Sequence, residues 1–179
     1  MDGNGKTLKM EKTMKNRLII FVFLLFLSSS ISFGQSKPVW VISFENNLKQ
    51  KETDWKIEET KEFSNKIGIY NYFYVLKSGI FQSSILINKL ADAPNRNPNV
   101  AEEAFKEIVG LFEKGILKNT NKVKVENFGD EGFIWTDVKI ENTTKTMLLF
   151  RKSDVFVQIY APSESIAKRF GKLVSEQMP

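Results

Sequence analysis

The residues whose type and spacing most directly suggest chemistry are two adjacent carboxylates, Asp130 and Glu131, in a glycine-flanked turn. Hard cations take oxygen ligands, so the pair is a candidate Ca²⁺ site, which Asp137 and Glu141 would join. Its spacing does not match the Asp/Asn-rich calcium loop. The alternative is a structural turn, in which the Asp carboxylate accepts main-chain N–H bonds and a glycine takes a positive φ.

A second group of candidates consists of aromatic and basic residues that could hold a ligand. Tyr70, Tyr72 and Tyr74 alternate along one segment, so they share one face of the strand that it predicts. If that face stays exposed, it suits contact with a ligand or a protein. Arg151, near a predicted hairpin tip, could clamp an anionic ligand. The alternatives are core positions for the tyrosines and edge protection or solubility for Arg151.

Two absences limit the reactions that the chain could catalyse, because it contains no histidine and no cysteine. This composition excludes Ser-His-Asp and thiol catalysis, disulfides and cysteine-based zinc sites. Carboxylates, lysine, tyrosine, and serine with a lysine base remain. The sequence therefore predicts a non-enzymatic binding protein without a cofactor. A hydrolase or lyase that joins Asp130 or Glu131 to another acid in a cleft is the alternative.

Apolar periodicity and turn signals place these candidates in an α+β domain. Alternating or short apolar segments between turn residues predict strands. The Ser78-Gly79 turn predicts that two of them form a hairpin, Ile69–Leu76 against Phe81–Asn88. The strands are expected over Val39–Phe44, Trp55–Phe63, Ile69–Leu76, Phe81–Asn88, Lys122–Glu126, Phe133–Ile140, Thr146–Arg151 and Val155–Tyr160, with a polar connection over Glu45–Asp54.

Two amphipathic helices complete the expected pattern. Asn99 can cap the first, with Glu102 as its reciprocal partner, and Gly115 can help to end it. Ser163 can cap the second. The segment Val155–Tyr160 carries large groups on both faces, so it should be a central strand. No βαβ alternation occurs, so the sequence predicts a mainly antiparallel sheet with two helices packed on it, ordered strands-helix-strands-helix.

The first 34 residues have the three-part pattern of a secretory signal peptide. A basic stretch precedes an apolar run of ten residues, and small residues follow. A spanning helix needs about 20 apolar residues. We therefore expect a leader over 1–34, cut between Gly34 and Gln35 or alternatively after Ser32, and a single domain over 35–179. A retained leader that tethers the domain to a membrane is the alternative.

The charge of the chain depends on this leader, which holds five basic and two acidic residues, so that its removal lowers the net charge from +5 to +2. A charge this small does not indicate nucleic-acid binding, which needs a clustered basic face. Met1, Met10 and Met14 are alternative start residues. The sequence predicts export to the bacterial periplasm or medium and an unidentified protein or small ligand as partner, with membrane contact only if the leader is retained.

The second half of the chain also carries a family resemblance. It reads FGDEGF over Phe128–Phe133 and LLFRKSDV over Leu148–Val155, and an amphipathic helix follows. This resembles small exported bacterial domains of unknown function with a GDEG or GDEA turn, although they often have glycine where this chain has Ser153 and Asp154. The order of elements is similar to the PsbP/Mog1/DcrB-like fold. The resemblance implies an antiparallel sheet flanked by helices, often without known catalytic residues, and it implies no ligand.

Overall fold

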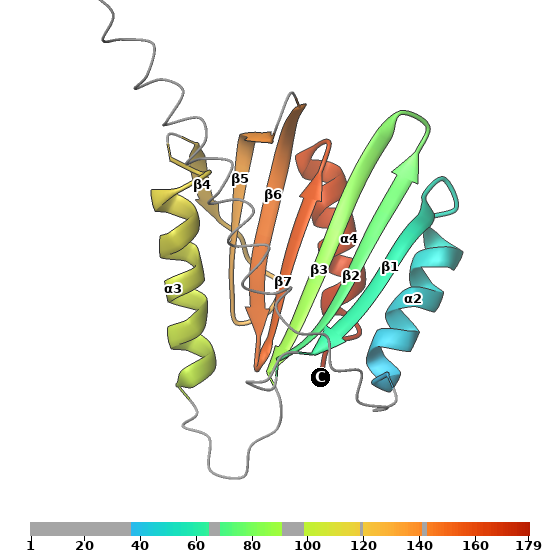
Figure 1. The fold of residues 1–179 in the computed structure, drawn as a ribbon, viewed down its shortest axis with the longest axis horizontal. Helices are drawn as coiled ribbons and strands as arrows, with labels where there is room; N and C mark the ends of the chain where they lie inside the picture. The colour runs from blue at the N-terminus through green and yellow to red at the C-terminus, as the bar shows by residue number, and fades with distance from the viewer. Residues whose placement is uncertain (1–36, 65–68, 91–98, 119, 141–142) are drawn as a thin grey trace, which may run out of the picture.

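The computed structural model describes residues 37–64, 69–90, 99–118, 120–140 and 143–179. The expected leader, Gln35 and Glu141 lie outside these ranges. The described residues form a seven-stranded antiparallel sheet with helices packed on it, which confirms the predicted α+β class. In chain order, the elements are α2 (Val39–Lys51), β1 (Lys56–Ser64), β2 (Ile69–Ser78), β3 (Phe81–Leu90), α3 (Val100–Lys114), β4 (Asn121–Lys124), β5 (Glu131–Ile140), β6 (Thr143–Lys152), β7 (Val155–Ala161) and α4 (Glu164–Ser175) (Figure 1).

The strand order of the sheet is β1-β2-β3-β7-β6-β5-β4. The predicted hairpin is present: β2 and β3 pair without a break, from Ile69 opposite Leu90 to Ser78 opposite Phe81. β7 is the middle strand, as its large side chains on both faces predicted. Because β7 joins the β1–β3 half to the β4–β6 half, a ligand on either face can contact residues from both halves of the chain.

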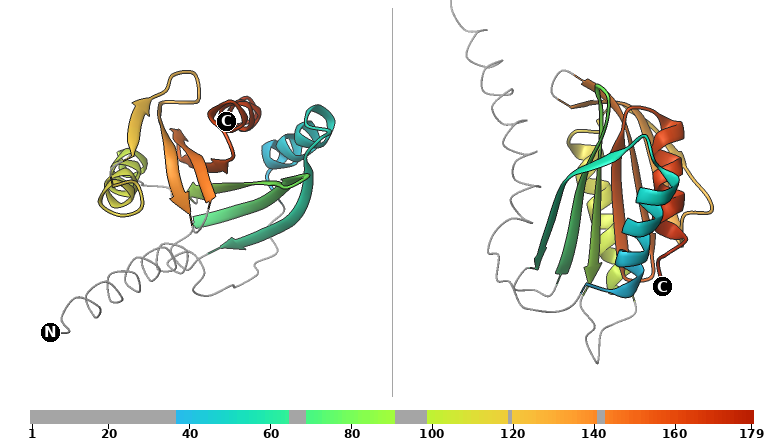
Figure 2. Two further views of the ribbon diagram at one scale, coloured as in Figure 1. Left: turned by 90° about the horizontal axis from the view of Figure 1, so that it is seen from above. Right: turned by 90° about the vertical axis from the view of Figure 1, so that its right-hand side faces the viewer.

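The helices lie on both faces of the sheet, which curves around α2 and α4 (Figure 2). We call the face that α2 and α4 cover the α2/α4 side, and the opposite face, on which α3 packs, the α3 side. On the α3 side, the Phe105 ring of α3 stacks on Phe133 and Phe156, with ring centroids 6.3 and 6.2 Å apart. The α2/α4 side holds the larger core, and its completely buried residues include Val41, Phe44, Leu48, Leu76, Ile85, Phe150, Val157 and Phe170.

The first element differs from the prediction, because the expected strand over Val39–Phe44 and most of the expected connection after it form the helix α2. Its buried residues Val41, Phe44 and Leu48 recur at helical spacing and continue past the predicted strand end. Pro38 precedes the helix, and its carbonyl oxygen accepts the first main-chain hydrogen bond, from Val41. The β-branched residues of this segment favour a strand locally, but burial of one helical stripe outweighs that preference.

The two predicted helices are present, with different N-terminal caps. Ser163 caps α4 as expected, because its Oγ accepts a hydrogen bond from the main-chain N–H of Ile166 at 3.4 Å. α3 begins after Asn99 as expected, but the Asn99 side chain makes no capping hydrogen bond. Gly115 ends α3, and its N–H reaches the carbonyl oxygen of Leu111. Both helices therefore begin where the sequence signals predict, but the predicted side-chain cap forms at α4 and not at α3.

Candidate functional site

The three tyrosines lie on the α2/α4 side of β2. Tyr72 and Tyr74 are 6% and 1% exposed, and Tyr70 packs partly buried against the same core. The Phe44 ring of α2 meets the Tyr74 ring edge-on, with 5.4 Å between the ring centroids. The tyrosine face is therefore not exposed, as the core alternative predicts, because the unpredicted helix α2 covers it. A ligand-binding role for these tyrosines stays a prediction.

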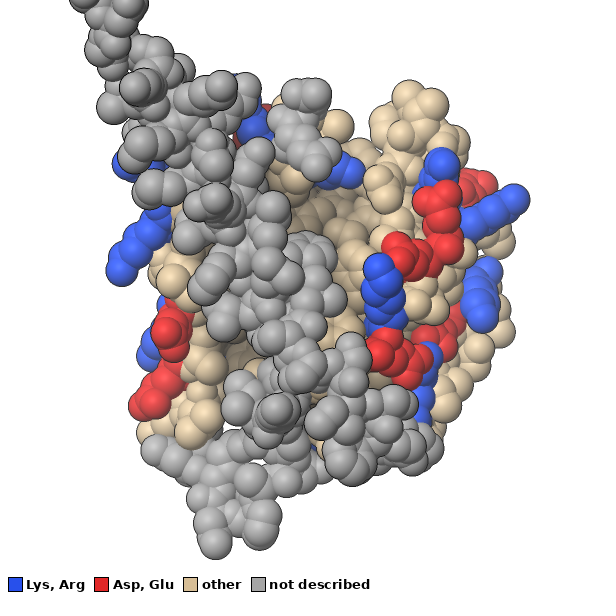
Figure 3. All heavy atoms as spheres, in the orientation of Figure 1, with Lys and Arg blue, Asp and Glu red and all other residues tan. Residues whose placement is uncertain are grey.

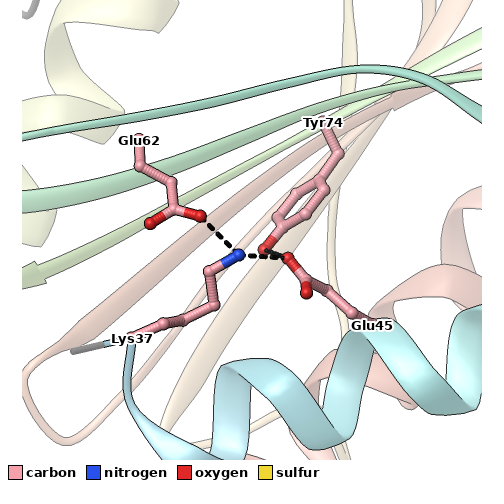
Figure 4. Close-up of polar contacts among 4 residues, drawn as sticks. All are labelled: Lys37, Glu45, Glu62 and Tyr74. Carbon is pink, nitrogen blue, oxygen red and sulfur yellow. Dashed lines mark hydrogen bonds and ion pairs between the residues drawn. The ribbon is translucent and has the colours of Figure 1, made fainter.

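The hydroxyl of Tyr74 belongs to a polar cluster at the start of α2, which we call the Lys37 cluster (Figure 4). Glu45 Oε1 accepts a hydrogen bond from the Tyr74 hydroxyl at 2.9 Å and another from Lys37 Nζ at 2.7 Å. Lys37 also forms an ion pair with Glu62 of β1. One ammonium group thus pairs with two carboxylates, and the cluster ties the start of α2 to β1 and β2.

The charges in the Lys37 cluster favour a structural role. Burial raises the pKa of the Tyr74 hydroxyl, and the neighbouring Glu45 carboxylate raises it further. Burial opposes the charge on Lys37, but hydrogen bonds to Glu45 and Glu62 outweigh burial, so the Lys37 pKa rises. A tyrosine and a lysine that hold their protons so firmly are unsuited to act as bases at neutral pH.

Asp130 fastens the tip of the β6–β7 hairpin. Its Oδ2 accepts hydrogen bonds from Arg151 Nη1 and from the main-chain N–H of Ser153, each at 2.8 Å. Gly129 has a φ of 148°, and a Cβ at this position would collide with the carbonyl oxygen of Arg151. These contacts favour the structural turn over the calcium site. Within the described ranges, no three acidic residues group as a metal ion would require.

Arg151 lies on the α3 side, on the opposite face of the sheet from the tyrosines, so the fold does not combine these candidates into one site. It stands opposite Glu131 in the β5–β6 register. Its side chain is 13% exposed. Nη1 also donates to the carbonyl oxygen of Ser153 at 3.1 Å, whereas the buried Nε has no hydrogen-bond partner within the ranges that the structure describes. The Nη1 group of the guanidinium is therefore committed to the hairpin tip.

The strongest candidate site is a pair of asparagines on the α3 side, Asn71 of β2 and Asn88 of β3, which we call the amide pair. The two residues are directly opposite each other in the β2–β3 register. They are 1% and 7% exposed, and neither Oδ1 atom has a hydrogen-bond partner among the described residues. A buried acceptor without a donor costs about 1–3 kcal/mol of stability. The fold thus holds a buried, unpartnered carbonyl oxygen on each of two opposite residues at a cost in stability.

The orientation of the Asn71 amide is set by its other end. Nδ2 donates to the main-chain carbonyl oxygens of Phe63 and Ile69, at 3.2 and 3.3 Å. Exchanging the oxygen and nitrogen would turn both contacts into repulsions between oxygens. The Asn71 atom without a hydrogen-bond partner is therefore the acceptor Oδ1. A group that satisfied it would have to be a hydrogen-bond donor.

Beside the amide pair, the α3 side continues as a half-buried mixture of apolar and uncharged polar residues. Phe73 lies opposite Leu86, which lies opposite Gln158, and Tyr160 follows on the same face of β7. Burial raises the pKa of the Tyr160 hydroxyl, and a hydrogen bond with Gln158 opposes this effect. Figure 3 views this side, with charges along its left and right borders and an uncharged visible surface next to those on the right. Apolar surface with a few polar groups is typical of small-molecule sites.

The sequence does not predict the amide pair, although it contains one signal. Asparagine is depleted in strands, and Asn71 interrupts the face that Ile69, Phe73 and Val75 otherwise make apolar. The partner residue, Asn88, becomes visible only through the register of the hairpin and the burial of both side chains.

Comparisons with known proteins add one similarity. No protein-family model matches this chain, and no solved structure matches it. The chain is similar to an uncharacterised protein of Methanocaldococcus jannaschii, with 27% identity over 153 residues. The match covers 77% of this chain and 89% of that protein. The similarity therefore extends over most of both proteins but brings no activity with it.

Proposed function

We propose that this chain is an exported, non-enzymatic domain that binds a small ligand on the α3 side, at the amide pair. The observation that carries the proposal is that Asn71 and Asn88 stand opposite each other with buried Oδ1 atoms that meet no donor in the described part of the chain. A ligand that fits them carries N–H or O–H donors on an apolar body, because Phe73 and Leu86 lie beside the pair.

The stability cost of the amide pair supports a functional role. A leucine at position 88 has the same branched arrangement of heavy atoms as asparagine and would leave no acceptor unpaired in the strand. Natural proteins keep such locally unfavourable residues mainly where function requires them. A bound donor would satisfy the oxygens, so that ligand binding restores the hydrogen bonds that the free protein lacks.

Export is supported by the leader pattern of residues 1–34 and by the resemblance to exported bacterial domains. Among the described residues, no helix is long and apolar enough to cross a membrane. The intact mass of the protein recovered from its own cells tests this part. A mass that begins at Gln35 is expected. A mass that still includes the leader would contradict cleavage and support the tethered alternative.

Ligand binding is tested with two probes of nearly the same shape, indole, which has one N–H donor, and indene, which has none. The measurement follows the side-chain amide signals of Asn71 and Asn88 by NMR during titration of the processed protein, which consists of residues 35–179. Indole is expected to shift both signals and to bind about three- to tenfold more tightly than indene, which is the effect of one net hydrogen bond.

Two variants show whether this difference arises at the amide pair. Asn88→Leu should abolish the preference for indole, because it removes one acceptor. Asn121→Leu changes an exposed asparagine of β4 and should preserve the preference. Equal binding of indole and indene by the unmodified protein, or an unchanged preference in Asn88→Leu, would contradict the proposed site.

A further inference from the structure

The tip of the β2–β3 hairpin exposes two large apolar side chains. Ser78 pairs with Phe81, so the turn consists of Gly79 and Ile80 alone. Ile80 is 92% exposed and Phe81 is 53% exposed. In Figure 1 this turn lies at the top of the molecule, whereas α2 begins at the opposite end, near the C-terminus.

Folding does not require an apolar residue at this tip. Gly79 supplies the positive φ of the turn, 56°, and short turns of this kind usually take Asn, Asp, Ser or Gly. With 92% of its surface exposed, the Ile80 side chain contributes almost nothing to the core. A serine would fit the same position, so the isoleucine needs an explanation outside the fold.

Lysine side chains surround the base of the tip. Lys56 of β1 and Lys77 of β2 are exposed and stand directly opposite each other, an arrangement that is unfavourable for stability. Lys145 of β6 donates from Nζ to the carbonyl oxygen of Gln82, the residue after Phe81, at 2.5 Å. Glu58 pairs with Lys77 at 3.2 Å, but Lys145 has no carboxylate partner in the described part of the chain.

We propose that this tip docks on a lipid bilayer that contains anionic lipids. Ile80 and Phe81 enter the boundary between headgroups and acyl chains, and the lysines contact lipid phosphates. Exposed apolar residues with lysines around them can hold a protein reversibly at such a surface. Neither the apolar contacts nor the charges are sufficient alone. The contact is made by the folded domain, so it does not depend on the leader or on the ligand proposed above.

The test is co-sedimentation of the processed protein with vesicles of phosphatidylcholine alone or mixed with phosphatidylglycerol. The protein is expected to bind the mixed vesicles. The double variant Ile80→Ser, Phe81→Ser should lower the vesicle partition coefficient about tenfold or more, because both apolar contacts are lost. Lys77→Gln combined with Lys145→Gln should lower it about tenfold on mixed vesicles and leave binding to phosphatidylcholine unchanged.

Val39→Ser is the matched control, because Val39 is 80% exposed at the start of α2, at the other end of the molecule. It should bind like the unmodified protein. Far-ultraviolet circular dichroism verifies that every variant is folded. No binding of the unmodified protein to mixed vesicles overturns the proposal. Equal binding by the double tip variant, or an equal loss in Val39→Ser, overturns it as well.

Discussion

The two sides of the sheet treat buried polar groups differently. On the α2/α4 side, the Lys37 cluster is paired throughout, and the 6% exposed Glu52 binds Arg169 Nε of α4 at 2.8 Å. Ser83 Oγ is the unpartnered atom on that side. On the α3 side, both Oδ1 atoms of the amide pair and Arg151 Nε are buried without partners. The unmet hydrogen-bonding capacity of the described residues therefore gathers on the α3 side.

The space around one helix glycine on each side of the sheet also differs. A Cβ on Gly171 of α4 would lie 2.5 Å from Leu148 Cδ2 and 2.9 Å from Phe128 Cε1. A Cβ on Gly110, at the edge of the buried stripe of α3, would meet nothing within 4 Å. The comparison indicates that the α2/α4 side is the close-packed scaffold, whereas the α3 side keeps groups that the scaffold does not need.

The largest effect is expected for Phe170→Ala. Phe170 is completely buried on the α2/α4 side and meets the ring of Trp55 with 5.2 Å between centroids. The lost contacts and the remaining cavity should lower the free energy of unfolding by about 3–5 kcal/mol. Urea denaturation measures the change. Leu111→Ala, at a 54% exposed position of α3, should change it by less than about 0.5 kcal/mol, and similar losses in both variants would contradict the comparison.

The second-largest loss of stability is expected for Gly171→Ala. The added methyl group must displace Leu148 or Phe128, so the variant should lose about 1–3 kcal/mol of stability despite the better helix propensity of alanine. Thermal unfolding followed by circular dichroism detects this loss. A variant as stable as the unmodified protein would show that α4 packs less closely on the sheet than the structure indicates.

Alkaline pH should destabilise the fold through buried tyrosines, among which Tyr74 is the one tested on the α2/α4 side. The ordinary tyrosine pKa is 10.0. In the folded protein, burial raises the pKa of Tyr74, and the Glu45 carboxylate raises it further. Above pH 10 the unfolded chain loses this proton first, so stability falls as pH rises, by about 1.4 kcal/mol per pH unit for this tyrosine. Urea unfolding at increasing pH measures the slope, and Tyr74→Phe should flatten it. An unchanged slope in that variant would exclude Tyr74 as the cause.

Gly110→Ala is expected to have the smallest effect and the opposite sign. Open space around the new methyl group leaves only the helix preference of alanine, which should add about 0.5–1 kcal/mol to the free energy of unfolding. The measurement is urea denaturation beside Gly171→Ala. A loss of stability in both glycine variants would remove the packing difference between the two sides.

Much of the fold is predictable from the sequence because it rests on local signals. Gly79 marks the β2–β3 turn, Ser163 marks the start of α4, and Val155–Tyr160 has the two-faced pattern of a middle strand. The helix α2 is not predictable in the same way, because the run Val39–Phe44 is as apolar and β-branched as a strand. The burial of Val41, Phe44 and Leu48 at helical spacing distinguishes the two interpretations, and burial is a tertiary property.

The candidate site is less predictable, because its residues are ordinary one by one. Asn71 and Asn88 lie 17 positions apart and come together through the register of a hairpin. That their Oδ1 atoms are buried without donors depends on every element around them. Conversely, Tyr74 and Arg151 looked suitable by residue type, but the fold commits one to the Lys37 cluster and the other to the Asp130 turn.

The most direct test of the central claim, that the α3 side keeps the amide pair at a cost in stability, is the free energy of unfolding of Asn88→Leu. Replacing a buried, unpartnered acceptor by an apolar group with the same branched shape should raise that free energy by about 1 kcal/mol in urea denaturation. A decrease of the same size would contradict the claim, because it would mean that the folded protein already satisfies the Asn88 side chain.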